Sequence, residues 1–193
     1  MSRNDTNENS DSENNKKIVL YVKKTKNGTH HTKYGVPFQC VELIRRFFSI
    51  HKGLTFPDVV DACDFFKNVH AFTPVSASVD ASSVSSSIVP IKTYAYPYSR
   101  QPSYYLRPGS ILFWKYKKPD YQYGHVALIW KTDTKNNQTY VVQQNLNPPI
   151  KIYDTTLLFS KMNSGSSKFA GIKILPREYL TGIRYLDCVV HKL

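Results

Sequence analysis

Apolar residues recur every three to four positions after residue 37, which is the spacing of an amphipathic helix. Pro37 stands near the start of this segment and Gly53 supplies a stop, so a helix is predicted over 37–53. Its apolar face holds Cys40, Val41, Ile44, Phe47 and Phe48, while Glu42, Arg45 and Arg46 fall on or near the opposite face. A second helix is predicted over 56–69, with Asp58 near its start.

Short runs rich in β-branched and aromatic residues predict the strands. One lies near the start of the chain, at 17–23, and the others follow residue 108, separated by polar turns. The later runs cover 110–114, 125–130, 140–146, 171–175 and 182–186. Helices first and strands afterwards indicate an α+β fold, with the helices packed on one face of an antiparallel sheet.

The remaining segments show neither the apolar spacing of a helix nor that of a strand. Residues 1–16 are rich in Asn, Ser and acidic residues with almost no apolar content, so we expect a disordered tail. The Ser-rich and then Tyr- and Pro-rich stretch 75–107 is predicted to be a long loop or insertion. With 193 residues, the chain has room for one domain over 17–193 in addition to the tail.

Charge and cysteine content indicate which partners and which cellular compartment to expect. A formal net charge of +12 favours non-specific contact with polyanions, although no long block of Lys and Arg appears. The polar N-terminus is not a secretory signal peptide, and no apolar run is long enough to span a membrane. Three cysteines are too few for a disulfide scaffold, so free thiols are expected. We therefore expect a cytoplasmic protein, or one delivered with a virion or into a host. The oligomeric state stays open.

Cys40 differs from Cys63 and Cys188 because it lies in the first turn of its predicted helix. There the unpaired backbone N–H groups and the positive end of the helix dipole stabilise a thiolate and lower the pKa of the thiol. The thiolate is the reactive form of cysteine. Cys40 is therefore the candidate nucleophile.

His125 is the candidate general base, since it opens a predicted strand directly after Gly124. If the strands at 125–130 and 140–146 form a hairpin with its turn near Lys135, Asn145 lies opposite His125 and Gln143 lies opposite Ala127. Asn145 would then orient the imidazole, which completes a Cys-His-Asn arrangement. At this stage a small α+β binding protein remains an equal alternative.

Four motifs carry a resemblance to a known family. YGVPFQCVELIRRF resembles the nucleophile segment of the CHAP amidases, in the papain-like group that includes the NlpC/P60 enzymes. More narrowly, it is similar to the amidase domain of the glutathionylspermidine and trypanothione synthetase-amidases. FPDVVDACDFF, RPGSILFWKYKKPDYQYGHVALIW and YVVQQN resemble the segments that follow there.

This resemblance implies a papain-like CHAP fold, with Cys40 as nucleophile, His125 as base and Asn145 as the orienting residue. Gln39 would help the backbone N–H of Cys40 to form the oxyanion hole. Gln143 stands where the family has Glu, which would weaken catalysis or shift its pH profile. No metal and no organic cofactor is required.

Three functions follow from these expectations. The first is hydrolysis of a glutathione–polyamine amide, the second is cleavage of peptidoglycan, and the third is an inactive CHAP-fold binding module. A cationic polyamine needs acidic contacts, for which the nearest candidates in sequence are Glu42, Asp58, Asp61 and Asp64.

Overall fold

A computed structural model describes residues 17–22, 33–75, 88–97, 106–116, 123–158, 167–183 and 186–192. The predicted tail 1–16 lies outside these residues, as do parts of the segment 75–107. Among the described residues no helix is long and apolar enough to cross a membrane.

An antiparallel six-stranded sheet, in the order β5-β10-β6-β7-β8-β9, forms the centre of the fold. The strands are β5 (Lys92–Ala95), β6 (Ile111–Tyr116), β7 (His125–Asp133), β8 (Gln138–Val142), β9 (Ile150–Asp154) and β10 (Ser167–Ile174). A smaller sheet contains β2 (Leu54–Thr55), β3 (Ala71–Pro74) and β4 (Val89–Pro90). The chain ends pair in parallel as β1 (Lys17–Val22) and β11 (Asp187–Lys192).

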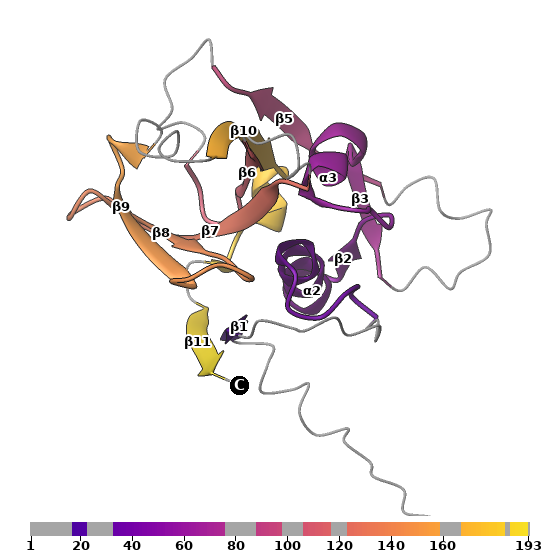
Figure 1. Ribbon diagram of the computed structural model, residues 1–193, viewed down its shortest axis with the longest axis horizontal. Helices are drawn as coiled ribbons and strands as arrows, with labels where there is room; N and C mark the ends of the chain where they lie inside the picture. Colours follow the sequence, from indigo (N-terminus) through magenta and orange to yellow (C-terminus); the bar gives the residue numbers. More distant parts are fainter. Residues whose placement is uncertain are drawn as a thin grey trace, which may run out of the picture.

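Two helices, α2 (Cys40–Lys52) and α3 (Ala62–Asn68), pack together on one side of the large sheet (Figure 1). The short 3₁₀ helix η3 (Arg177–Tyr179) precedes β11. The larger hydrophobic core lies between the helices and the sheet, and a smaller one covers the other face of the sheet. This mixed fold, with few helices and antiparallel sheets, agrees with the α+β prediction.

Four details of the predicted elements need correction. Helix α3 begins at Ala62 instead of residue 56, because Asp61 caps it by accepting a hydrogen bond from the Asp64 N–H at 2.8 Å. The segment 75–107 is not a loop throughout: β4 and β5 lie within it, and β5 is held by pairing with β10. The run 182–186 does not open as a strand, since Gly182 lies in a turn, Ile183 has a 3₁₀ conformation and the final strand begins at Asp187.

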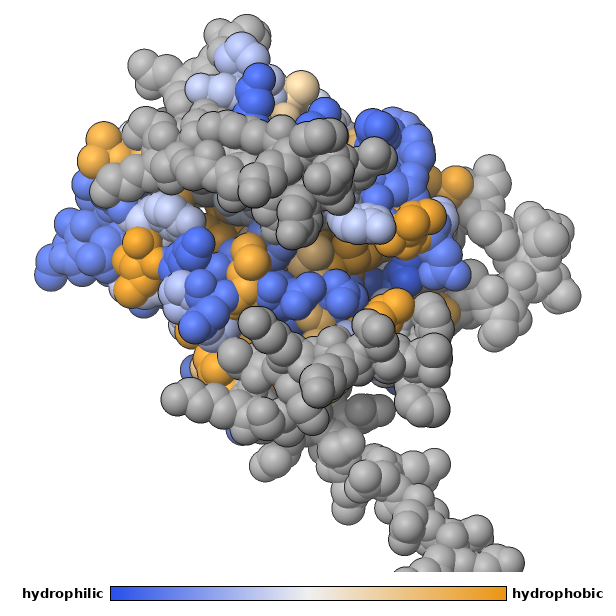
Figure 2. Space-filling view, viewed as in Figure 1, coloured by the Kyte–Doolittle hydropathy of each residue, from blue (hydrophilic) through white to orange (hydrophobic). Residues whose placement is uncertain are grey.

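The fourth correction concerns the polar face of α2. Glu42, Arg45 and Arg46 are all buried, although the helical periodicity placed them opposite the core. Arg45 donates to the backbone carbonyl oxygens of Tyr34 and Pro57, so a loop covers that side of the helix. On the face shown in Figure 2, hydrophobic residues are scattered among hydrophilic ones and form no single large patch.

Candidate active site

A cleft of about 390 Å³ brings Cys40 and His125 together. Cys40 is the first residue of α2 and His125 the first residue of β7, so two secondary-structure starts meet in this cleft. Gln39 and Asn145 also line it, whereas Gln143 lies behind His125 and does not. Of the five residues predicted for the site, four therefore share one cavity.

The backbone before Cys40 is strained in a way that fixes the start of the helix. Phe38 has a positive φ of 65°, which is unfavourable for a bulky side chain. Its ring is held edge-on against Tyr21, with the ring centroids 5.5 Å apart. Gln39 then returns to an extended conformation as the N-cap, and Cys40 follows as the first helical residue.

Burial dominates the chemistry of the nucleophile. Cys40 is 8% exposed, and this burial raises the pKa of its thiol to about 11, with a smaller contribution from the Asp61 carboxylate. The backbone N–H groups of Val126, Val41 and Cys40 lower the pKa but do not cancel the burial. The prediction of a lowered thiol pKa is therefore wrong for the free protein, because the cost of burying a thiolate exceeds the benefit of the helix start.

His125 is also neutral at rest. Burial lowers the pKa of its imidazole to about 4, the hydrogen bond with Gln143 acts to raise it, and Lys151 lowers it further. The imidazole packs against the Trp114 ring, with the ring centroids 5.7 Å apart. At neutral pH the pair consists of a thiol and an imidazole that can accept a proton.

Gly124 is required for this placement of His125. Its φ is +67°, and a Cβ atom there would lie 2.6 Å from the Trp114 carbonyl oxygen and 2.8 Å from the Cys63 sulfur. The small residue before the histidine therefore accommodates a neighbouring strand and helix.

The side chain in contact with the imidazole is Gln143, and not Asn145 as the sequence predicted. The Nε2 of His125 lies 3.2 Å from the Oε1 of Gln143. Gln143 donates through its own Nε2 to the Pro148 carbonyl oxygen at 2.7 Å, which fixes the orientation of the amide. An amide oxygen only accepts, so Nε2 of His125 carries the proton and Nδ1 is left as the basic nitrogen.

The predicted hairpin register is correct on one side of a bulge between Ile129 and Lys131, but it is wrong by one residue between that bulge and the turn, where Lys131 pairs with Tyr140. Leu128 pairs with Val142 and Ile129 with Val141, as the alternation indicated. The ladder then stops, and Asn145 takes a positive φ of 63° outside the sheet. Its amide donates to the Oε1 of Gln39 at 3.0 Å, so Asn145 holds the residue before the nucleophile.

A buried polar network that the sequence did not reveal lies behind the start of α2. Glu42 accepts from Arg46 at 2.6 Å through one oxygen and from Gln144 at 2.7 Å through the other. Gln144 also donates to the backbone carbonyl of Gln39 at 3.2 Å. The only signal in the sequence was the run of three amide residues at 143–145, directly after a strongly apolar strand.

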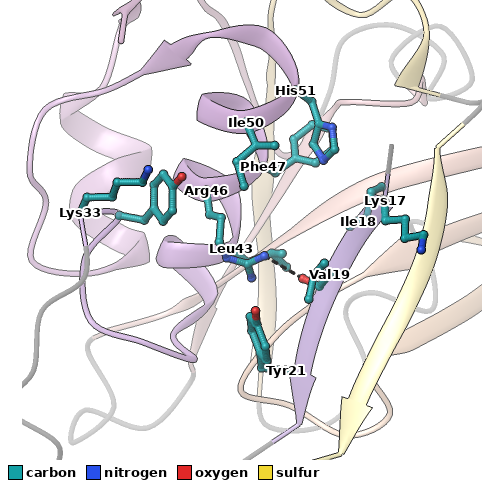
Figure 3. A pocket seen from close by; sticks show the side chains of 11 residues that line it. Lys17, Ile18, Val19, Tyr21, Lys33, Leu43, Arg46, Phe47, Ile50 and His51 are labelled. Atoms are coloured by element: carbon teal, nitrogen blue, oxygen red, sulfur yellow. Dashed lines mark hydrogen bonds between the residues drawn. The ribbon is translucent and has the colours of Figure 1, made fainter. Parts of the chain in front are cut away.

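Strand β1 closes this network from the outside. Arg46 donates to the Val19 carbonyl oxygen at 3.0 Å, and its guanidinium lies over the Tyr21 ring (Figure 3). The backbone N–H of Tyr21 donates to Gln144 at 3.3 Å. A second cavity, of about 230 Å³, lies between β1 and α2 beside these contacts.

No group of three or more metal-ligating side chains occurs within the part of the chain that the structure describes. All three cysteines are free thiols. The cleft itself contains the thiol of Cys40 and the imidazole of His125.

Comparison with known families identifies the architecture. The family model described as the CHAP domain matches residues 29–145, which is more than half of the chain. A CHAP domain indicates an amidase or peptidase, and with it a peptide or peptidoglycan substrate. None of the curated proteins compared with the chain matches it.

Proposed function

The chain belongs to the CHAP-domain family, and from this premise we propose that it hydrolyses an amide bond through a thioester on Cys40. The observation that carries the proposal is the shared cleft of Cys40 and His125, in which Gln143 holds the Nε2 side of the imidazole. A nucleophile at a helix start beside a base at a strand start is also the arrangement of papain-like enzymes. We therefore propose that the helices and the sheet of this chain pack as they do in papain-like enzymes.

The first half of the reaction forms the thioester. Nδ1 of His125 takes the thiol proton as the Cys40 sulfur attacks the carbonyl carbon of the amide. The resulting oxyanion is held by the backbone N–H of Cys40, with the side-chain amide of Gln39 as a second donor. The C–N bond then breaks, and His125 returns the proton to the departing amine.

The second half releases the acid. Water loses a proton to Nδ1 of His125 and attacks the thioester carbonyl, after which Cys40 leaves and recovers the proton as a thiol. Because Asn145 donates to the Oε1 of Gln39, the NH₂ group of Gln39 is left to face the cleft. Asn145 is therefore a positioning residue for the oxyanion donor, and Gln143 orients the base.

Two substrates fit this chemistry. A glutathione–polyamine amide is favoured by the resemblance of the segment around Cys40 to the glutathionylspermidine amidases. A peptidoglycan fragment is favoured by the family and by the net charge of +12, which suits an anionic wall or another polyanion. An inactive binding module is the remaining alternative, because Gln143 is neutral where the resemblance implies a carboxylate.

The deciding experiment incubates the protein with glutathionylspermidine and, separately, with peptidoglycan fragments, and follows the products by mass spectrometry. Cys40→Ala is the test variant, and Cys63→Ala is the matched control, because Cys63 does not line the cleft. Release of spermidine or of wall peptides, lost in Cys40→Ala and kept in Cys63→Ala, would support the hydrolase and identify its substrate. Binding without release of any product would favour the inactive module.

A further inference from the structure

We propose that the cleft selects substrates that carry an ammonium group near the scissile amide, and that Asp61 binds this group through an ion pair. The inference rests on the proposed hydrolase and specifies its substrate class. Two acidic side chains, Glu42 and Asp61, and one basic side chain, Arg45, line the cleft. Their net charge is therefore opposite in sign to the +12 of the whole chain.

Two of the four acidic residues near the site already have cationic partners. Glu42 lies deep in the cleft wall and is 5% exposed, and the Arg46 guanidinium and the Gln144 amide occupy its two oxygens. Asp58 is fully exposed and forms an ion pair with Arg45 at 2.9 Å. Arg45 lines the cleft, so its positive charge there is already paired with Asp58.

The third acid, Asp64, is also occupied, and it does not line the cleft. Its oxygens accept from the backbone N–H of Val60 and from the side chain of Asn68. Asp61 differs because it lines the cleft and is only half-buried. One of its oxygens accepts the capping N–H of Asp64, and among the described residues no ion pair neutralises it.

The position of Asp61 relative to the nucleophile supports this role. Among the described residues, Asp61 is the charged group that acts on the Cys40 thiol, and it raises the pKa of that thiol by less than burial does. A carboxylate that opposes ionisation of the nucleophile is a cost for catalysis unless it does something else. Binding the cationic group of a substrate would give Asp61 a role that offsets this cost. The bound cation would also cancel the effect of the carboxylate on the thiol pKa.

The walls around Asp61 define the rest of the substrate. Val36, Val59 and Val60 line the cleft together with Tyr34 and Tyr123, and Val60 and Tyr123 are 87% and 64% exposed. An extended chain with apolar methylene groups that ends in an ammonium would contact these side chains and reach Asp61. Polyamines and the side chains of diamino acids have this chemistry, and their N-acetylated forms lack the charge.

The test compares each amine-bearing substrate with its N-acetylated form. The probes are glutathionylspermidine and peptidoglycan fragments with a free amine, each offered with the amine free and acetylated. Asp61→Asn removes the charge but keeps an oxygen that can cap α3, so the helix should persist. Asp64→Asn is the matched control, because it removes a neighbouring charge outside the cleft.

The expected result is that wild-type protein prefers the free amine in kcat/KM by about fivefold, the upper range for one partly exposed ion pair. Asp61→Asn should lose this preference and Asp64→Asn should keep it, and added salt should reduce it. Equal rates on the two forms, or a preference that survives Asp61→Asn, would overturn the inference and leave the hydrolase intact.

If no probe is hydrolysed in a Cys40-dependent manner, the proposed function fails but the inference can still be decided. Equilibrium binding of the same probes to the Cys40→Ala protein then replaces the kinetic readout. Tighter binding of the free amine that is lost with Asp61→Asn would support the inference. Equal binding of the free and acetylated forms would refute it.

Discussion

Replacing Gln143 by Glu is the sharpest test of how the imidazole is held. The substitution keeps the length of the side chain and places a carboxylate where a neutral oxygen now lies 3.2 Å from Nε2 of His125. A carboxylate stabilises the imidazolium, so the pKa of His125 must rise. An opposite charge at this distance moves a pKa by about 1–3 units, which corresponds to about 1.4–4 kcal/mol.

The pH profile should follow this shift. His125 acts as a base only when it is neutral, so activity is lost as the pH falls through its pKa, which is about 4 in the native protein. In Gln143→Glu the acid limb of kcat/KM should therefore lie about 1–3 pH units higher. The assay is kcat/KM against pH on a substrate that the native protein hydrolyses. Titration of the His125 ring proton by NMR gives the same pKa without any need for turnover.

A matched control separates this effect from the general cost of an added charge. Gln138→Glu introduces the same change at the far end of β8, where the side chain contacts Tyr140. Gln143→Glu also loses the hydrogen bond to the Pro148 carbonyl, so circular dichroism should first show that the variant is folded. An imidazole pKa that stays near its native value in folded Gln143→Glu, or that moves equally in Gln138→Glu, would refute the orienting role of Gln143.

Three further predictions follow from buried groups. Because the Cys40 thiol has a pKa of about 11, its alkylation by iodoacetamide in the free protein should rise about tenfold per pH unit from neutral pH, and a plateau below pH 9 would contradict this. Glu42→Gln leaves the buried Arg46 without its counter-charge and should lower the free energy of unfolding by about 3 kcal/mol in urea titrations, whereas the exposed Glu178→Gln should leave it nearly unchanged. Lys173 is fully buried with a pKa lowered to about 8, so the unfolded chain binds more protons above that pH and the native protein gains stability as the pH rises toward the ordinary lysine value. Lys173→Met should lack this gain, on the order of 3 kcal/mol, when the unfolding midpoints of the two proteins are compared across that range.

Local pattern was sufficient to predict the elements that carry the nucleophile and the base. The apolar spacing after Pro37 predicted a helix around Cys40, and the structure begins α2 at that residue. The two apolar runs around the polar turn near Lys135 predicted the hairpin, whose observed register agrees with the prediction at Leu128 and Ile129 and is shifted by one residue nearer the turn, where a bulge follows Ile129. Both results depend on short-range periodicity, which the sequence displays directly.

The partner of the base could not be predicted in the same way. Extending the register placed Asn145 opposite His125, but the chain leaves the sheet after Val142. The backbone N–H of Gln143 donates to the Pro149 carbonyl oxygen at 2.8 Å, so the strand folds back on itself there. Such a local reversal ends the alternation, and only the three-dimensional path shows which amide reaches the imidazole.

The pKa values of the Cys40 thiol and the His125 imidazole could not be predicted from the sequence either. The position of Cys40 at a helix start argued for a lowered thiol pKa, yet burial raises it. Burial depends on segments distant in sequence, such as β7 packing against α2. The same reason explains why charged positions in α2 were expected to face solvent: the partners of Arg46 include Val19 and Gln144, which are separated from it by 27 and 98 residues.

The polar network behind the nucleophile extends beyond the region that defines the family. The family match covers residues 29–145, whereas β1 ends at Val22. Arg46 nevertheless donates to the Val19 carbonyl, and the Gln144 oxygen that accepts from Arg46 also accepts the Tyr21 N–H, so β1 supplies partners to two buried side chains of the network. Since β1 is itself paired with β11, the strand that contacts the nucleophile helix is held in place by the other flank of the chain. The loop that carries Gln143 and Asn145 is thus held against Gln39 by a network that the matched region does not complete on its own.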